Sequence, residues 1–144
     1  MHPEYFKTRF LVAHDVSTWP DCFAIISAFA TTGQFWPDAE NDAADQRLAE
    51  ELQHASVWRV RITGFSPETG HAEPSWAVAM GFQKACDIGA RHCQDAIYYV
   101  ESDALYVSFC DGRRALIPVD SFRSRLDKPD TNSIRTKDIT REED

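Results

Sequence analysis

The sequence lacks the features that mark several large classes of protein. No apolar run approaches the roughly 18 residues that a membrane-spanning helix needs. The first residues, Met1-His2-Pro3-Glu4, do not show the basic and then apolar pattern of a signal peptide. We therefore expect a cytoplasmic protein with no membrane partner.

Motifs that indicate a known catalytic or metal centre are also missing. The glycines are dispersed and form no phosphate-binding loop, and there is no G-x-S-x-G or H-E-x-x-H motif. No two cysteines are spaced as C-x-x-C. Isolated cysteines in a reducing compartment are usually small buried hydrophobic residues, which we expect of Cys22, Cys86, Cys93 and Cys110. We expect no structural metal and no cofactor.

The chain has fewer basic than acidic side chains. The chain has 15 basic against 23 acidic side chains and a formal net charge of −8. Proteins that bind duplex nucleic acid through its phosphates usually carry a basic surplus, and a polyanionic membrane surface is disfavoured for the same reason. We therefore expect no nucleic-acid partner.

The composition is that of one folded domain followed by a polar tail. The 144 residues suffice for one hydrophobic core but not for two, and the apolar share of 43% is ordinary. From Asp127 onward the only large apolar residues are Ile134 and Ile139, too few to offset the entropy lost on ordering. We predict a single domain over residues 1–126 and a disordered tail over residues 127–144.

Hydrophobic periodicity predicts two helices among short strands. Apolar residues recur at the helical period over residues 38–55 and 82–93. Gly89, inside the second helix, lowers helix propensity and indicates close packing against the sheet. A short helix capped by Asp120 is predicted over residues 120–126. Apolar runs and alternations predict strands at residues 10–13, 22–29, 58–63, 75–80, 96–100, 105–109 and 115–117.

The order of these elements predicts an α+β fold. Two helices would cover one face of a mainly antiparallel sheet. The middle of the chain follows a split β-α-β-β-α-β order. We therefore predict a ferredoxin-like β-α-β-β-α-β core with extra edge strands.

The string His71-Ala72-Glu73-Pro74 is the most suggestive local motif. H-x-E also opens the signature of zinc nucleobase deaminases, which needs P-C-x-x-C further on. The later cysteines here are Cys86 and Cys93, about 10 Å apart along one predicted helix, too far to share a zinc ion with ligands at about 2.3 Å. The deaminase interpretation is therefore disfavoured.

Glu73 and His71 remain candidates for catalysis without a metal. A loop carboxylate beside a histidine suits acid-base chemistry, with Glu73 as general base and His71 in support. The structural alternative is that Glu73 anchors its loop through a surface ion pair with Arg59 or Arg61.

Three more polar residues, at or near the ends of apolar elements, are candidates for binding a ligand. Ser27 lies in the central strand, Asn41 opens the first helix, and Gln94 links the second helix to the next strand. Structural alternatives exist here too: Asn41 could satisfy helix-start amides, and Gln94 could cap the last carbonyls of its helix.

Three stretches of the chain carry a family resemblance. They are Ala24-Ile25-Ile26-Ser27-Ala28-Phe29 followed by Glu40-Asn41, then Gly64-Phe65-Ser66-Pro67 with His71-Ala72-Glu73-Pro74-Ser75-Trp76-Ala77-Val78, and Cys93-Gln94-Asp95-Ala96-Ile97-Tyr98. In this order they resemble the small bacterial family catalogued as domain of unknown function 3293, over roughly residues 10–119.

The family pattern has an "ITAxNP" strand end, an asparagine before a helix, a "G-x-x-P…E-x-S-W-x-V" block and a "GQ-A-I" strand start. This chain departs from it at Phe29-Ala30-Thr31-Thr32, which replaces Asn-Pro, and at Cys93, which replaces the glycine. The resemblance implies no established activity. It supports the fold and the choice of Asn41, Glu73 and Gln94.

Three hypotheses for function follow. The first is a ligand-binding or regulatory module, with a polar cleft where the strand ends carrying Ser27, Glu73 and Gln94 converge. The second is a small hydrolase or transferase that uses Glu73 as general base. The third is a protein-interaction adaptor, either monomeric or homodimeric, with Trp36 and Trp58 as anchors. A concave pocket with a carboxylate of raised pKa would favour the enzyme, whereas a flat apolar patch would favour the adaptor.

Overall fold

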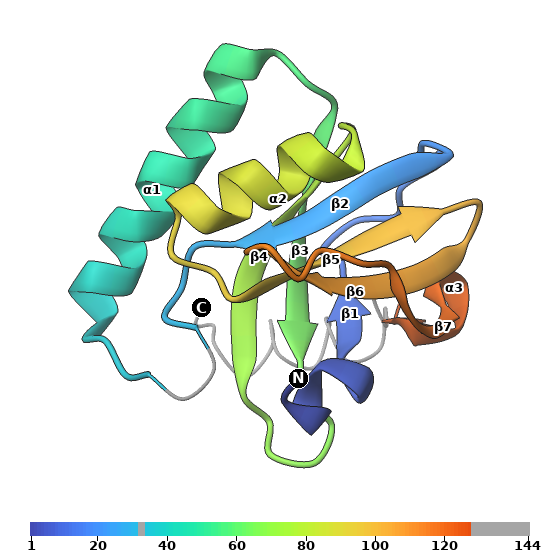
Figure 1. The fold of residues 1–144 in the computed structure, drawn as a ribbon, viewed down its shortest axis with the longest axis horizontal. Helices are drawn as coiled ribbons and strands as arrows, with labels where there is room; N and C mark the ends of the chain where they lie inside the picture. The colour runs from blue at the N-terminus through green and yellow to red at the C-terminus, as the bar shows by residue number, and fades with distance from the viewer. Residues whose placement is uncertain (32–33, 128–144) are drawn as a thin grey trace, which may run out of the picture.

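The protein is an α+β structure built on one curled, eight-stranded sheet (Figure 1). The computed structural model describes residues 1–31 and 34–127. The strand order is β7-β6-β5-β2-β4-β3-β1-β8, and every pairing is antiparallel except that of β1 with β8. The strands are β1 (Arg9–Leu11), β2 (Cys22–Ser27), β3 (Arg59–Phe65), β4 (Ala72–Val78), β5 (Ala96–Glu101), β6 (Ala104–Phe109), β7 (Ile117–Ser121) and β8 (Leu126–Asp127). The predicted α+β class and mainly antiparallel sheet are confirmed.

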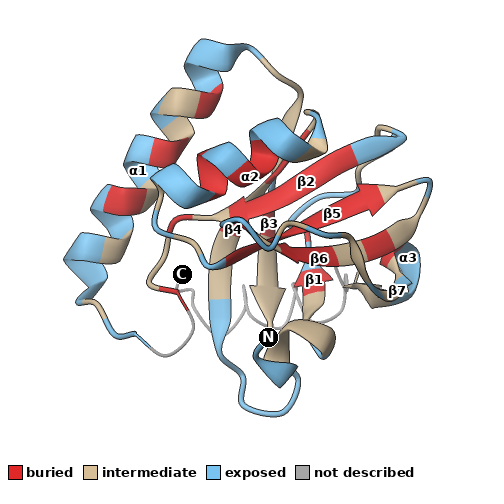
Figure 2. Ribbon diagram, in the orientation of Figure 1, coloured by how far each residue is buried: buried red, intermediate tan, exposed pale blue. Residues whose placement is uncertain are grey.

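Strand β2 is buried on both of its faces. Its residues Phe23–Ile26 are buried in the pattern that a continuous apolar run predicts for an internal strand (Figure 2). Side chains alternate across a strand, so Ala24 and Ile26 face one core cluster while Phe23 and Ile25 face the other. Both edges of β2 are hydrogen-bonded, to β4 and to β5.

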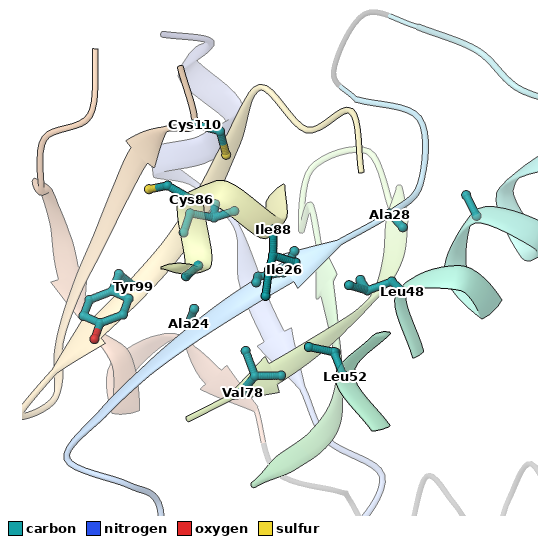
Figure 3. Packing of buried hydrophobic residues seen from close by; sticks show 13 residues of the cluster. Ala24, Ile26, Ala28, Leu48, Leu52, Val78, Cys86, Ile88, Tyr99 and Cys110 are labelled. Atoms are coloured by element: carbon teal, nitrogen blue, oxygen red, sulfur yellow. The ribbon is translucent and has the colours of Figure 1, made fainter. Parts of the chain in front are cut away.

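Helices α1 (Asp38–Ala55) and α2 (Phe82–Arg91) cover one face of the sheet. The bounds of α1 are those predicted, and its buried stripe packs with α2 onto β2, as Figure 3 shows for Leu48, Leu52, Ile88 and Ile26. Helix α2 ends two residues before the predicted end. The cause is Cys93, whose φ of 62° lies in the left-handed region and cannot continue a helix.

The opposite face of the sheet is filled by aromatic side chains. The ring centroid of Phe122 lies 5.0 Å from that of Trp19, 5.1 Å from Phe23 and 6.0 Å from Phe10. Phe122 opens α3 (Phe122–Arg125), a single turn that joins the two edge strands β7 and β8. Since one helical turn is only about 5 Å long, the sheet has to curl to bring these edges together.

The cap of α3 differs from the one predicted. Ser121, not Asp120, is the N-cap, and its Oγ accepts a hydrogen bond from the amide of Ser124. Asp120 instead accepts from the amide of Ser121 and pairs with Arg125, 3.0 Å away. The sequence offers two adjacent capping residues, and the structure uses the second.

The C-terminal segment is folded one residue further than predicted. Asp127, assigned to the tail by composition, forms β8 opposite Leu11, and its carboxylate lies 2.6 Å from the guanidinium of Arg9. The rest of the predicted tail, residues 128–144, lies outside the described residues. None of the described helices combines the length and the hydropathy that a membrane crossing requires.

Gly89 lets α2 approach the sheet closely, as its place in the helical pattern predicts. A Cβ atom added at Gly89 would lie 2.7 Å from Cys110 Sγ and 2.8 Å from Ile97 Cγ2, closer than real Cβ contacts allow. The missing side chain therefore sets the distance between α2 and the strands beneath it.

We predict that Gly89→Ala destabilises the protein although alanine is the better helix former. Helix propensity alone would add up to about 1 kcal/mol of stability, whereas overpacking in a core costs about 1–3 kcal/mol. Urea unfolding should show a net loss. Gly112→Ala is the matched control, because a Cβ there meets nothing within 4 Å. A gain in stability for Gly89→Ala would contradict the close approach.

Candidate functional site

A cavity of about 650 Å³ lies at one end of the sheet, where β2 ends and β4 and β5 begin. Its lining combines Phe10, Ile25 and Tyr98 of the aromatic side with Asp38 and Asn41 of the first turns of α1. All five residues proposed from the sequence line it: Ser27, Asn41, His71, Glu73 and Gln94. The volume is in the range of small-molecule sites.

Strand register places Glu73 inside this cavity. Ser75 pairs with Ile62 of β3 on one side and with Ser27 of β2 on the other, so these side chains share a face. Glu73 lies two residues before Ser75, on the same face, and its direct partner across the pair is Gly64. Since Gly64 has no side chain, the space beside the Glu73 carboxylate stays open.

The carboxylate of Glu73 has no arginine partner among the described residues. Its Oε2 lies 3.0 Å from Nε2 of His71, with 26% of the Glu73 side chain and 70% of the His71 side chain exposed. The suggested ion pair with Arg59 or Arg61 is wrong. Arg61 lies on the helix side of the sheet, where it pairs with Asp45 of α1 and stacks 4.4 Å over the ring of Trp76.

Ser27 and Gln94 hold the chain that leaves β2. Ser27 Oγ accepts from the amide of Phe29 at 3.0 Å and donates to the carbonyl of Pro74 at 3.3 Å. Gln94 Nε2 donates to the carbonyl of Phe29 at 2.7 Å and to that of His92 at 3.3 Å. Gln94 thus contacts the end of its own helix, as the structural alternative supposes, but its shorter bond crosses to the segment after β2.

Asn41 of α1 also forms hydrogen bonds to the main chain that follows β2. Its Oδ1 accepts from the amide of Ala30 at 2.8 Å, and its Nδ2 donates to the carbonyl of Trp36 at 3.4 Å. No side-chain hydrogen bond caps the start of α1, where Pro37 is the N-cap, so the suggested role of Asn41 at the helix-start amides is wrong. Asn41 is a positioning residue for the cavity wall.

Tyr98 is a cavity residue that the sequence did not single out. Its side chain is buried, and its hydroxyl donates to the carbonyl of Tyr5 at 2.7 Å. Burial, above all, and the nearby charge of Glu73 raise the pKa of Tyr98 well above its usual value, so it stays a neutral donor. The available signal was its place in the predicted strand that begins two residues after the candidate Gln94.

The tryptophans proposed as docking anchors pack against the core. Trp36 contacts the helix-side cluster, and Trp58 contacts the aromatic cluster, with its ring 5.8 Å from that of Trp19. Both are partly buried, and their role as anchors stays a prediction. The large apolar side chain that is exposed near the cavity is Phe35, with 88% of its surface accessible.

The cysteines divide into two kinds. Cys86 and Cys110 are buried, as expected of small hydrophobic residues, whereas Cys22 and Cys93 are exposed, contrary to that expectation. Cys93 occupies the position where the family pattern has glycine, and its left-handed backbone explains why glycine suits that position. In the part of the chain that the structure describes, no three His, Cys, Asp or Glu side chains group closely enough to hold a metal ion.

We predict that Glu73→Gln changes the free energy of unfolding by less than about 1 kcal/mol. The only ion pair of Glu73 among the described residues is with an exposed histidine, and exposed pairs contribute about 0–1 kcal/mol. Chemical denaturation would measure this. Gln94→Ala is the comparison, and it should cost about 1–3 kcal/mol because the Phe29 carbonyl loses its partner. A loss as large for Glu73→Gln would make Glu73 part of the scaffold.

Comparison with known proteins gives one match. No curated protein and no solved structure matches the chain. The model of one family, described as "Protein of unknown function (DUF3293)", matches residues 26–97, which are half of the chain. That stretch holds all five candidate residues of the cavity. The chain therefore belongs to the DUF3293 family of proteins of unknown function.

Proposed function

We propose that this protein is a ligand-binding module that takes a small organic molecule into the cavity beside Glu73. The observation that carries the proposal is a convergence: Ser27, Glu73 and Gln94 come from separate parts of the chain and line one cavity of about 650 Å³. Pockets of this size with a few converging polar groups are the usual form of a small-molecule site.

The polar residues of the cavity fall into two groups, those bonded to the main chain and Glu73, and this difference supports the proposal. Ser27, Asn41 and Gln94 use their side-chain hydrogen bonds on main-chain groups of Phe29, Ala30 and Trp36, three residues of the cavity wall. Within residues 1–31 and 34–127, Glu73 forms no side-chain hydrogen bond to the main chain, and its carboxylate stays partly accessible. A fixed wall beside an available charged group is what a preorganised site needs.

We also propose that β2-α1-β3-β4-α2-β5 forms a ferredoxin-like core. Its support is the strand order β5-β2-β4-β3 within the sheet, with each of these pairs antiparallel. The remaining strands then extend this core at both edges. An experimental structure in which β4 did not lie between β2 and β3 would refute the assignment.

Binding can be tested by NMR with an isotope-labelled protein and a fragment library of amines, alcohols and carboxylic acids. We predict shift changes that cluster at Ser27, Tyr98 and the side-chain amide of Gln94. Gly64→Leu should abolish these shift changes. A Cβ at Gly64 fits in ordinary contact with Thr8 and Phe10, so the variant can fold. The rest of the leucine side chain would then fill part of the cavity.

Gly112→Leu is the matched control, since this glycine lies outside the cavity and has open space around it. It should bind fragments like the unaltered protein. Spectra of both variants report whether they are folded. Shifts that fall elsewhere, or that survive in a folded Gly64→Leu protein, would refute the proposed site.

Hydrolysis or group transfer with Glu73 as general base is the second candidate function. The observation that favours it is the 3.0 Å contact between Glu73 Oε2 and His71 Nε2, in which the imidazole can orient the carboxylate. We predict that Glu73→Gln then lowers the hydrolysis of an activated ester such as p-nitrophenyl acetate by about 10²–10⁴-fold. An equal rate in Glu73→Gln and the unaltered protein would exclude this role for Glu73 in hydrolysis.

A further inference from the structure

The ionisable groups of the cavity are almost all of one sign. The described residues that line it include the carboxylates of Glu4, Asp38 and Glu73 and the imidazole of His71, but no lysine or arginine. A ligand carboxylate or phosphate would meet repulsion there with no cation to answer it.

Three arginines pair with carboxylates outside the cavity lining: Arg9, Arg61 and Arg125 with Asp127, Asp45 and Asp120. Arg125 also donates to the main-chain carbonyl of the cavity-lining Thr8 at 3.1 Å, but its carboxylate partner is Asp120. Within residues 1–31 and 34–127, Glu4 and Asp38 form no ion pair, and Glu73 pairs only with His71. The negative charge of the cavity is therefore left largely uncompensated by described basic side chains.

Aromatic side chains share the cavity lining with these carboxylates. Tyr5 and Phe65 are partly exposed, whereas Phe10 and Tyr98 are buried and pack edge-on with ring centroids 5.1 Å apart. The face of an aromatic ring attracts a cation, and it also accommodates the apolar body that carries one. A carboxylate among apolar walls attracts a cation more strongly than the same group in open water does.

A metal ion does not fit this arrangement. Calcium requires six to eight oxygen ligands and magnesium a regular octahedron, whereas no three acidic, histidine or cysteine side chains of the described segments come together in a metal-binding group. Aromatic and aliphatic side chains make up much of the wall. The cation that suits it is therefore organic.

We infer that the cavity selects a small organic cation, an amine or guanidine whose charge meets Glu73 and whose apolar body lies against the partly exposed side chains of Tyr5 and Phe65. This inference rests on the proposed ligand-binding function and names the class of ligand. The net charge of −8 acts in the same direction, since it raises the local concentration of cations around the protein.

Three probes that share a phenethyl group and differ in charge test the inference: phenethylamine, phenethyl alcohol and hydrocinnamate. NMR titration should show phenethylamine binding in the cavity at least about tenfold more tightly than phenethyl alcohol, as expected for a charge-assisted hydrogen bond. Hydrocinnamate should cause no chemical-shift changes at residues that line the cavity. This comparison uses the unaltered protein and does not depend on any variant folding.

Two variants assign the selectivity to Glu73. Glu73→Gln should lower the affinity for phenethylamine to that for phenethyl alcohol and leave the alcohol unaffected. Glu50→Gln is the matched control, because it removes the same charge from the exposed face of α1, away from the cavity, and it should change neither affinity.

Each failure has its own meaning. Equal or tighter binding of the alcohol or the anion would overturn the inference while the proposed ligand site stands. Retention of the amine preference in Glu73→Gln would overturn the role of Glu73 in it. Absence of cavity shifts with all three probes would also overturn the inference, and the fragment library then decides whether the proposed function falls with it.

Discussion

The structure depends on the burial of β2 between two hydrophobic cores. Phe23, Ala24, Ile25 and Ile26 are at most 3% exposed, and they supply side chains alternately to the helix side and to the aromatic side. A strand covered on both faces can satisfy its amides and carbonyls only within the sheet, which β4 and β5 provide on its two edges. The cavity begins where this burial stops, at Ser27.

The chain beyond β2 explains why so many polar residues gather at one place. It leaves the sheet next to two cores, so its amides and carbonyls require partners that the ladder no longer supplies. Ser27, Asn41 and Gln94 provide them from β2, α1 and the α2–β5 connection. These residues therefore shape the site without having to touch a ligand, whereas Glu73 is held by strand register and left available.

Two glycines leave room for neighbouring side chains, one on each face of the sheet. Gly89 removes a side chain from α2 so that the helix can lie against Ile97 and Cys110. Gly64 removes one from β3 directly opposite Glu73, so that Phe10 packs beside the gap and the carboxylate faces open volume. On this face the curl of the sheet, closed by α3 and Phe122, encloses the aromatic side chains that line one side of the cavity.

Periodicity in the sequence accounts for the local structure. It predicted α1 to the residue and a strand at the position of β2, because burial repeats every 3.6 residues in helices and every two in strands. The partners of individual residues follow from the fold as a whole: Asn41 bonds to Ala30, Asp127 pairs with Arg9, and Gly64 lies opposite Glu73. These contacts join residues from different elements, and a periodic pattern shows which face of an element is buried but not which element covers it.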